Sequence, residues 1–85
     1  MKTVYKYRLL VDMGFTLCIH SGFKPLSIDV QDGDIFMWAM IDTAEPLIMI
    51  EMHAIGTGQH IPEDVTYIDT VMLSGFVWHF FYKLK

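Results

Sequence analysis

A short loop with two glycines, Gly56-Thr57-Gly58-Gln59-His60, is the segment best suited to hold an anion. Glycine leaves the backbone N–H groups open to a ligand, and several such groups together can cradle a phosphate. Thr57 and Gln59 add side chains that form hydrogen bonds. The loop is not a P-loop, because no Lys-Ser/Thr follows, and it does not match the dinucleotide-binding fingerprint. A loop that only needs positive φ angles is the alternative.

Trp38, Lys6, Arg8 and Lys24 are the side chains best suited to add stacking and charge. Stacking of a base on an aromatic side chain contributes about 1–3 kcal/mol. Trp38 is favoured over the other aromatic candidates because the segment around it is apolar on both sides. The others are Tyr5, Tyr7, Phe36, Phe76 and Trp78. Arg8 could bind a phosphate through two hydrogen bonds at once. The simpler interpretations are that Trp38 packs in the core and that the basic residues form a solvated strand face that protects a sheet edge.

Catalytic and metal-binding patterns are missing from the sequence. His20, His53, His60 and His79 show no recognised ligand spacing, and Glu51 and His53 alone would not make a metal site. There is no GxSxG motif and no Cys/His pair whose proximity can be argued. We therefore expect no enzymatic activity, no metal and no cofactor, and we expect His79 to be a half-buried histidine of a sheet.

The elements that must position these residues are strands. Val, Ile, Phe, Tyr and Trp dominate seven runs, and no convincing helix is present. The sequence predicts a single all-β domain over residues 1–85, a small antiparallel sandwich or partly open barrel. The seven expected strands are Thr3–Leu10, Thr16–His20, Leu26–Gln31, Asp34–Ile41, Leu47–Ile55, Tyr67–Leu73 and Phe76–Leu84.

Short turns predict which strands pair. Asp32-Gly33 and Ser74-Gly75 favour tight hairpins, so the third and fourth strands should pair, and so should the sixth and seventh. The fourth and fifth strands can also pair across residues 43–46, which would give a meander. A helical turn is expected only at residues 61–64.

The fourth strand is apolar on both faces, with Ile35, Met37, Ala39 and Ile41 on one and Phe36, Trp38 and Met40 on the other. Antiparallel sheets of small monomers usually keep one face polar. The chain is also rich in hydrophobic residues, at 53% of 85. We therefore expect a homo-oligomer, a dimer or tetramer, in which a second copy or a ligand covers one face. A compact monomer with some exposed methionine is the alternative.

Charge and cysteine content indicate which partners and which cellular compartment suit the protein. The net charge is −4, which disfavours binding of DNA or RNA polymers. Five of the six basic residues lie at the two ends, and all ten acids lie between Asp12 and Asp69. Cys18 is the only cysteine, so no intrachain disulfide forms and a reducing compartment is favoured. We expect Cys18 to be a small buried hydrophobic residue, and we expect neither a signal peptide nor a membrane span.

Several segments together carry a resemblance to a known family. They are Val4–Tyr7, Gly22–Ser27, Val30–Gly33, Trp38–Asp42, Gly56–Pro62, Tyr67–Val71 and Val77–Phe81. On these segments the whole chain resembles a family of small proteins encoded by tailed phages, most without an assigned function, and is similar to the anti-CBASS sponge proteins. The Gly-Thr-Gly-x-x-Ile-Pro segment is its most specific part.

The resemblance implies an immune-evasion protein of the host bacterial cytoplasm. Such a protein sequesters cyclic dinucleotide signals, such as 3′3′-cGAMP, between its subunits without hydrolysing them. The resemblance does not assign individual contact residues, so the eight residues named above are candidates from their chemistry alone. The alternative is a phage accessory or inhibitor protein that binds a host or phage protein through its apolar sheet face.

Overall fold

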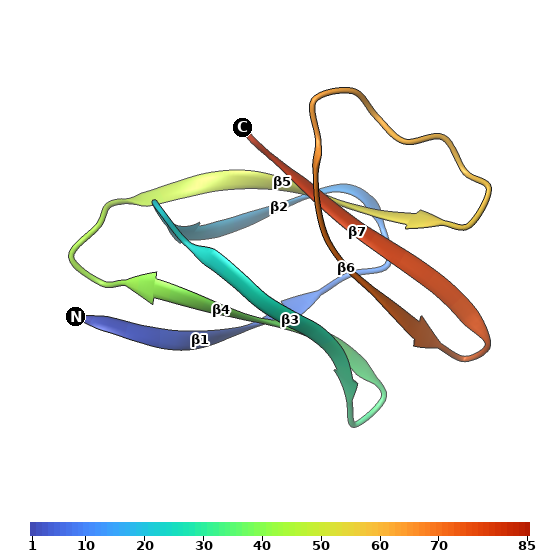
Figure 1. Ribbon diagram of the computed structural model, residues 1–85, viewed down its shortest axis with the longest axis horizontal. Helices are drawn as coiled ribbons and strands as arrows, with labels where there is room; N and C mark the ends of the chain where they lie inside the picture. Colours follow the sequence, from blue (N-terminus) through green and yellow to red (C-terminus); the bar gives the residue numbers. More distant parts are fainter.

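The computed structural model describes residues 1–85, except for the side chain of Met13. Seven strands form, as the sequence predicts, and they make a two-layered, all-β open sandwich (Figure 1). The strands are β1 (Lys2–Leu9), β2 (Met13–His20), β3 (Lys24–Gln31), β4 (Asp34–Asp42), β5 (Leu47–Gly56), β6 (Thr66–Leu73) and β7 (Phe76–Leu84).

All pairs of neighbouring strands are antiparallel. The first sheet has three strands in the order β1-β4-β3, and the second has four in the order β2-β5-β7-β6. Asp32-Gly33 and Ser74-Gly75 form the expected hairpin turns, with φ angles between +52° and +82° at the four residues. The predicted pairing of the third with the fourth strand, and of the sixth with the seventh, is therefore confirmed.

The expected meander is wrong. β4 does not pair with β5 across residues 43–46, because β4 lies between β1 and β3 while β5 lies between β2 and β7. The turn carries the chain from one sheet to the other, and it is closed by hydrogen bonds from Glu45 N–H to the Asp42 carbonyl and from Ser21 N–H to the Pro46 carbonyl. The expected helical turn at residues 61–64 is also absent; this stretch is irregular, with Asp64 at φ +61°.

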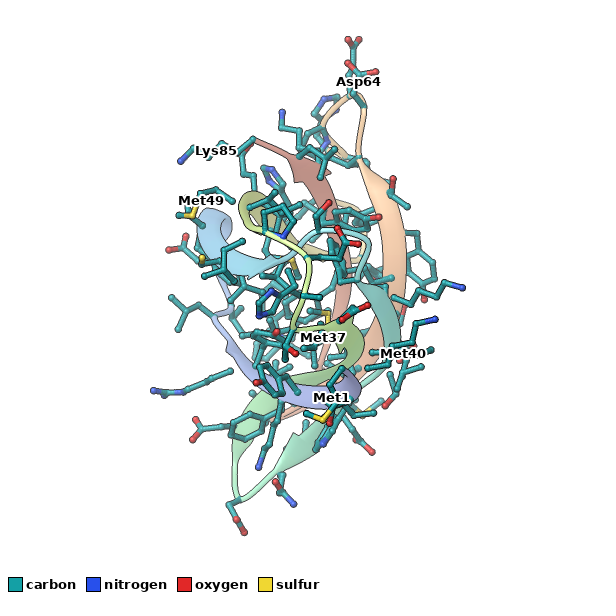
Figure 2. The ribbon with its side chains drawn as sticks, turned by 90° about the vertical axis from the view of Figure 1, so that its left-hand side faces the viewer. Met1, Met37, Met40, Met49, Asp64 and Lys85 are labelled. Atoms are coloured by element: carbon teal, nitrogen blue, oxygen red, sulfur yellow. The ribbon has the colours of Figure 1, made fainter. Side chains whose placement is uncertain are left out.

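The core lies between the two sheets and explains one apolar face of β4. Ile35, Met37, Ala39 and Ile41 are at most 2% exposed, and they face Ile50, Met52, Ala54 and Phe80 of the second sheet. This face is thus covered within one chain and needs no second copy. Figure 2 shows Met37 near the middle of the molecule, with Met40 and Met49 toward opposite sides.

The open edges of the two sheets meet at β3 and β6. The Asp69 carboxylate of β6 accepts a hydrogen bond from the Ile28 N–H of β3 at 2.9 Å. Both strands carry a bulge nearby, between Pro25 and Ser27 and between Tyr67 and Asp69. Bulges redirect side chains and interrupt a ladder. They therefore allow the Asp69 side chain to satisfy a backbone donor on the opposite sheet.

The surface is ordinary in extent and includes many large apolar side chains. The accessible area is 5201 Å², which is what a folded 9.9 kDa monomer is expected to expose. Several large apolar side chains are nevertheless exposed, among them Leu47, Met49, Tyr67 and Met72. Cys18 is exposed as well, so the prediction of a buried cysteine is wrong. Its position in β2 puts it opposite Met49 on the outer side of the second sheet.

Candidate ligand-binding site

The second apolar face of β4 is the outer face of the three-stranded sheet. Phe36 and Trp38 are half-buried there, and Met40 is 37% exposed. The registers put Lys6 opposite Trp38 and Lys24 opposite Met40, and directly opposed residues share a face. The structure thus brings Lys6, Trp38 and Lys24 together, with Arg8 and Phe36 beside them. These five residues are called the aromatic–cationic face below.

Lys6 lies over the aromatic rings of this face. Its Nζ atom is 4.1 Å from the centroid of the Phe36 ring and 5.7 Å from that of Trp38. It also donates a hydrogen bond to Gln31. The two rings are 6.2 Å apart and tilted by 56°. An exposed cation–π contact contributes about 0.5–1 kcal/mol, so a ligand that stacks more strongly can displace the ammonium group.

Arg8 is tied to the hairpin end of the same face. Its guanidinium group lies 3.3 Å from the carboxylate of Asp34, and both side chains are largely exposed. Exposed ion pairs of this kind contribute about 0–1 kcal/mol. Asp29, which lies opposite Phe36, adds a second carboxylate near this end. The carboxylates therefore outnumber the guanidinium group at the hairpin end of the face.

The opposite end of the face is hollowed and basic. A cavity of about 180 Å³ is lined by Lys2, Gly22, Lys24, Met40, Ile41 and Asp42. Asp42 accepts hydrogen bonds from the Ala44 N–H and the Met1 ammonium group, each at 3.0 Å. These bonds, first that from Ala44, hold the pKa of Asp42 below its usual value, with a smaller contribution from the nearby Lys2 charge.

The glycine loop lies on the other sheet, where β5 ends. Its donors are partly used within the loop: Gly56 N–H donates to the Gln59 side-chain oxygen at 2.7 Å, and Gln59 N–H donates to the Gly56 carbonyl at 3.0 Å. A Cβ atom at Gly56 would lie 3.2 Å from that side-chain oxygen. Gly56 thus makes room for Gln59, while Gly58 takes a φ angle of +90°. Both roles are structural needs for glycine.

A chain of hydrogen bonds runs from this loop into the sheet. Thr57 Oγ1 lies 3.0 Å from His79 Nε2, His79 Nδ1 lies 2.9 Å from Thr70 Oγ1, and Thr70 lies 2.6 Å from the Tyr67 hydroxyl. His79 is half-buried and bonded at both nitrogens, which confirms the interpretation of a satisfied sheet histidine. Beside it, a cavity of about 240 Å³ is lined mainly by the loop, Ile55 and Phe81.

His53 is a buried histidine with a different environment. It is 7% exposed, and neither ring nitrogen has a hydrogen-bond partner among the residues that the structure describes. Its Nε2 atom is 3.6 Å from the Glu51 carboxylate, which lies at the same distance from Lys83. Glu51 and His53 therefore share a face, as the strand spacing predicts. Within the described residues, no three histidine, cysteine or acidic side chains gather as metal ligands would.

The eight candidate residues thus divide into two groups. Lys6, Arg8, Lys24 and Trp38 share the outer face of one sheet. Gly56, Thr57, Gly58 and Gln59 lie at the end of the other sheet, where they line two cavities that contain no residue of the first group. One chain therefore does not present all eight residues to a single small ligand.

Two residues of this region, Phe36 and Lys2, were not among the eight candidates, although Phe36 was considered for stacking beside Trp38. Phe36 follows from the same alternation that singled out Trp38, because it lies two positions earlier on the same face. Lys2 lies an even number of residues from Lys6 and Arg8, so alternation along the strand places it on the same face. The link between Thr70, Tyr67 and His79 has no such signal, since it depends on the register of β6 against β7 and on the bulge before Asp69.

A comparison with protein families finds one match that spans the chain. The family is described as a domain of unknown function, DUF7352, and its model covers residues 1–85. The chain belongs to this family. No curated protein matches the DUF7352 chain, and neither does any solved structure. In addition, the described residues include no helix long and apolar enough to cross a bilayer.

Proposed function

We propose that this protein captures a cyclic dinucleotide such as 3′3′-cGAMP and holds it without hydrolysing it. The observation that carries the proposal is the aromatic–cationic face, on which Trp38, Lys6, Arg8 and Lys24 lie together. The ligand class comes from the resemblance to phage anti-CBASS sponge proteins. Immune evasion in the cytoplasm of an infected bacterium is the corresponding biological role.

The face offers both kinds of contact that a nucleotide needs. A base stacks on Trp38, with Phe36 beside it, for about 1–3 kcal/mol. Lys6 moves from the ring face and, with Arg8, compensates phosphate charge, because its present contacts are exposed and weak. Ammonium, guanidinium and aromatic groups bind a phosphodiester without attacking it, which fits sequestration rather than turnover.

The glycine loop joins the site only if a second copy supplies it. It lies on the other sheet of its own chain, so we propose that the ligand is held where two subunits of a dimer or tetramer meet. The exposed apolar side chains at Leu47, Met49 and Met72 support self-association. A desolvated pocket between subunits would also slow release, which a sequestering protein requires.

Ligand-dependent melting tests the proposal. We expect a large upward shift of the melting temperature with one or more members of a panel of cyclic dinucleotides, and recovery of intact nucleotide by mass spectrometry after denaturation. Trp38→Ala should abolish most of the shift. Leu84→Ala serves as the control, since it removes an exposed apolar side chain from the other sheet, at the end of β7 far from the glycine loop. No shift with any of the panel ends the proposal, and degraded nucleotide makes the protein an enzyme.

Docking to another protein through an apolar sheet face is the second candidate function. The exposed Leu47 and Met49 on the outer side of the second sheet favour it, and the acidic middle of the sequence suits a basic partner. Capture of one stoichiometric host or phage protein, without any nucleotide-dependent change in melting, would favour this function over sequestration.

A further inference from the structure

We infer that the cavity between Lys2 and Lys24 is an anion subsite that receives a phosphate group of the bound nucleotide. The inference rests on the proposed function for the identity of the ligand. The cavity itself stands on its own observations: a volume of about 180 Å³ and lysines from two different strands on its rim.

The strand register explains why both lysines reach this cavity. Lys24 of β3 lies opposite Met40 of β4, and Lys2 of β1 lies opposite Asp42. β4 is the central strand of its sheet, so the two ammonium groups approach the Met40 side chain from opposite sides. A phosphate above Met40 would have a cation on each side, and lysine binds phosphate as a flexible point charge.

These two lysines are also the cations on the outer side of this sheet that form no direct bond to another described side chain. Arg8 is paired with Asp34, and Lys6 is bonded to Gln31. Among the described residues, neither Lys2 nor Lys24 forms an ion pair or a side-chain hydrogen bond. Asp42 is the one acid on the rim, and its carboxylate is already bonded to the Met1 ammonium group and the Ala44 N–H. A phosphate entering the cavity therefore displaces no existing partner of either lysine.

The charge along β4 orients the ligand. The hairpin end of the face carries Asp29, Asp32 and Asp34, whereas Lys2 and Lys24 lie at the other end. Trp38 and Met40 are two residues apart on one face, which is about 7 Å along a strand. A ribose bridges that distance between a base and its phosphate. A base stacked on Trp38 thus places its phosphate at the Lys2–Lys24 cavity and away from the acidic hairpin.

Two measurements test the inference, and each has its own ligand. In the first, inorganic phosphate is titrated into the ¹⁵N-labelled protein. We expect the largest amide shifts at Lys2, Gly22, Lys24 and Asp42, which line the cavity. Shifts spread evenly over all basic residues, or none at all, would overturn the anion subsite whatever the outcome for nucleotides.

The second measurement compares binding of 3′3′-cGAMP between two double variants. Lys2→Gln with Lys24→Gln should weaken binding by about tenfold or more, since two charge-assisted contacts are lost. Lys83→Gln with Lys85→Gln removes the same charge from the other sheet and should change binding less than about twofold. If the first double variant binds as tightly as the wild type while Trp38→Ala does not bind, the subsite is wrong and the proposed function stands. If the wild type itself binds no cyclic dinucleotide, the proposed function fails, and the phosphate titration alone decides the subsite.

Discussion

The carboxylate of Asp69 accepts a hydrogen bond from the backbone N–H of Ile28 at 2.9 Å and so joins the edges of the two sheets. The same carboxylate accepts the Thr70 N–H at 2.8 Å. Asp69 is half-buried, so its loss leaves backbone donors without a partner in a site with restricted access to water. Asp69 therefore adds a polar link to the apolar packing that joins β3 and β6.

Asp69→Ala should lower the free energy of unfolding by about 1–3 kcal/mol, because a partly buried donor is left unsatisfied. Chemical denaturation measures the change. Asp29→Ala is the matched control: Asp29 accepts only the N–H of the next residue and is exposed, so its loss should have a smaller effect. Equal effects of the two substitutions would show that the contact between the sheets adds no stability.

Trp38→Ala should weaken cyclic dinucleotide binding by about one to two orders of magnitude, which corresponds to the stacking energy of one base. Isothermal titration calorimetry gives the affinity directly. The Trp38 side chain is half-buried and lies outside the core, so the fold should persist, and circular dichroism checks this. Undiminished affinity in a folded variant would remove Trp38 from the site.

Lys6→Met keeps most of the apolar stem over Phe36 and removes the charge. We expect weaker nucleotide binding at low salt and a difference from the wild type that shrinks as salt is raised, because screening acts on exposed charges. The affinity is measured at several ionic strengths. A loss of binding that does not depend on salt would mean that Lys6 acts by packing.

Protonation of Asp42 at acid pH should destabilise the turn between the sheets, because the carboxylate accepts hydrogen bonds from Ala44 N–H and the Met1 ammonium group. The pKa of Asp42 is lowered, first by the Ala44 N–H, so the folded protein binds this proton less readily than the unfolded chain does. The resulting stability is fully present above the ordinary value of 3.8 and is lost as pH falls below it. Melting temperatures between pH 2 and pH 6 should fall less steeply in Asp42→Asn. Identical slopes would rule out this residue as the cause.

Light scattering at micromolar concentration should give a mass of two or four subunits. Met40→Glu and Met49→Glu then identify the covered surface, because these side chains lie on the outer faces of different sheets (Figure 2). The substitution on the covered face should dissociate the oligomer, while the other should not. A mass of one subunit for the wild type, with no binding of an apolar dye, would contradict self-association.

The strands could be predicted from the sequence because their signals are local. Alternation and the Asp32-Gly33 and Ser74-Gly75 turns located all seven strands and two of the pairings. The crossing of the chain from β4 in one sheet to β5 in the other could not be predicted. Residues 43–46 indicate that the chain reverses direction there, but not which strand β5 pairs with. The two apolar faces of β4 did indicate that both sides of this strand are covered. One of these faces is covered by the second sheet of the same chain and not by a second copy.

Only the part of the candidate site that depends on local alternation could be predicted from the sequence. Parity places Lys6 and Arg8 on one side of a strand, whereas Lys24 reaches the same face through its register opposite Met40. The return of the Gln59 side chain onto Gly56 N–H and the bonding of Thr57 to His79 are tertiary contacts. No local sequence pattern predicts these two contacts, although they determine which hydrogen-bond donors of the loop remain open to a ligand.

The crossing of β4 into β5 also has a consequence for how the chain reaches its native state. Only the two hairpins, β3–β4 and β6–β7, bring neighbours in the sequence together, while β1 must find β4 and β2 must find β5. Closing such long loops costs entropy before any contact repays it, so folding should take milliseconds to seconds. During that interval the unpaired β1 and β2 expose strand edges. A high local concentration of newly synthesised chains would therefore favour exchange of these strands between neighbouring copies.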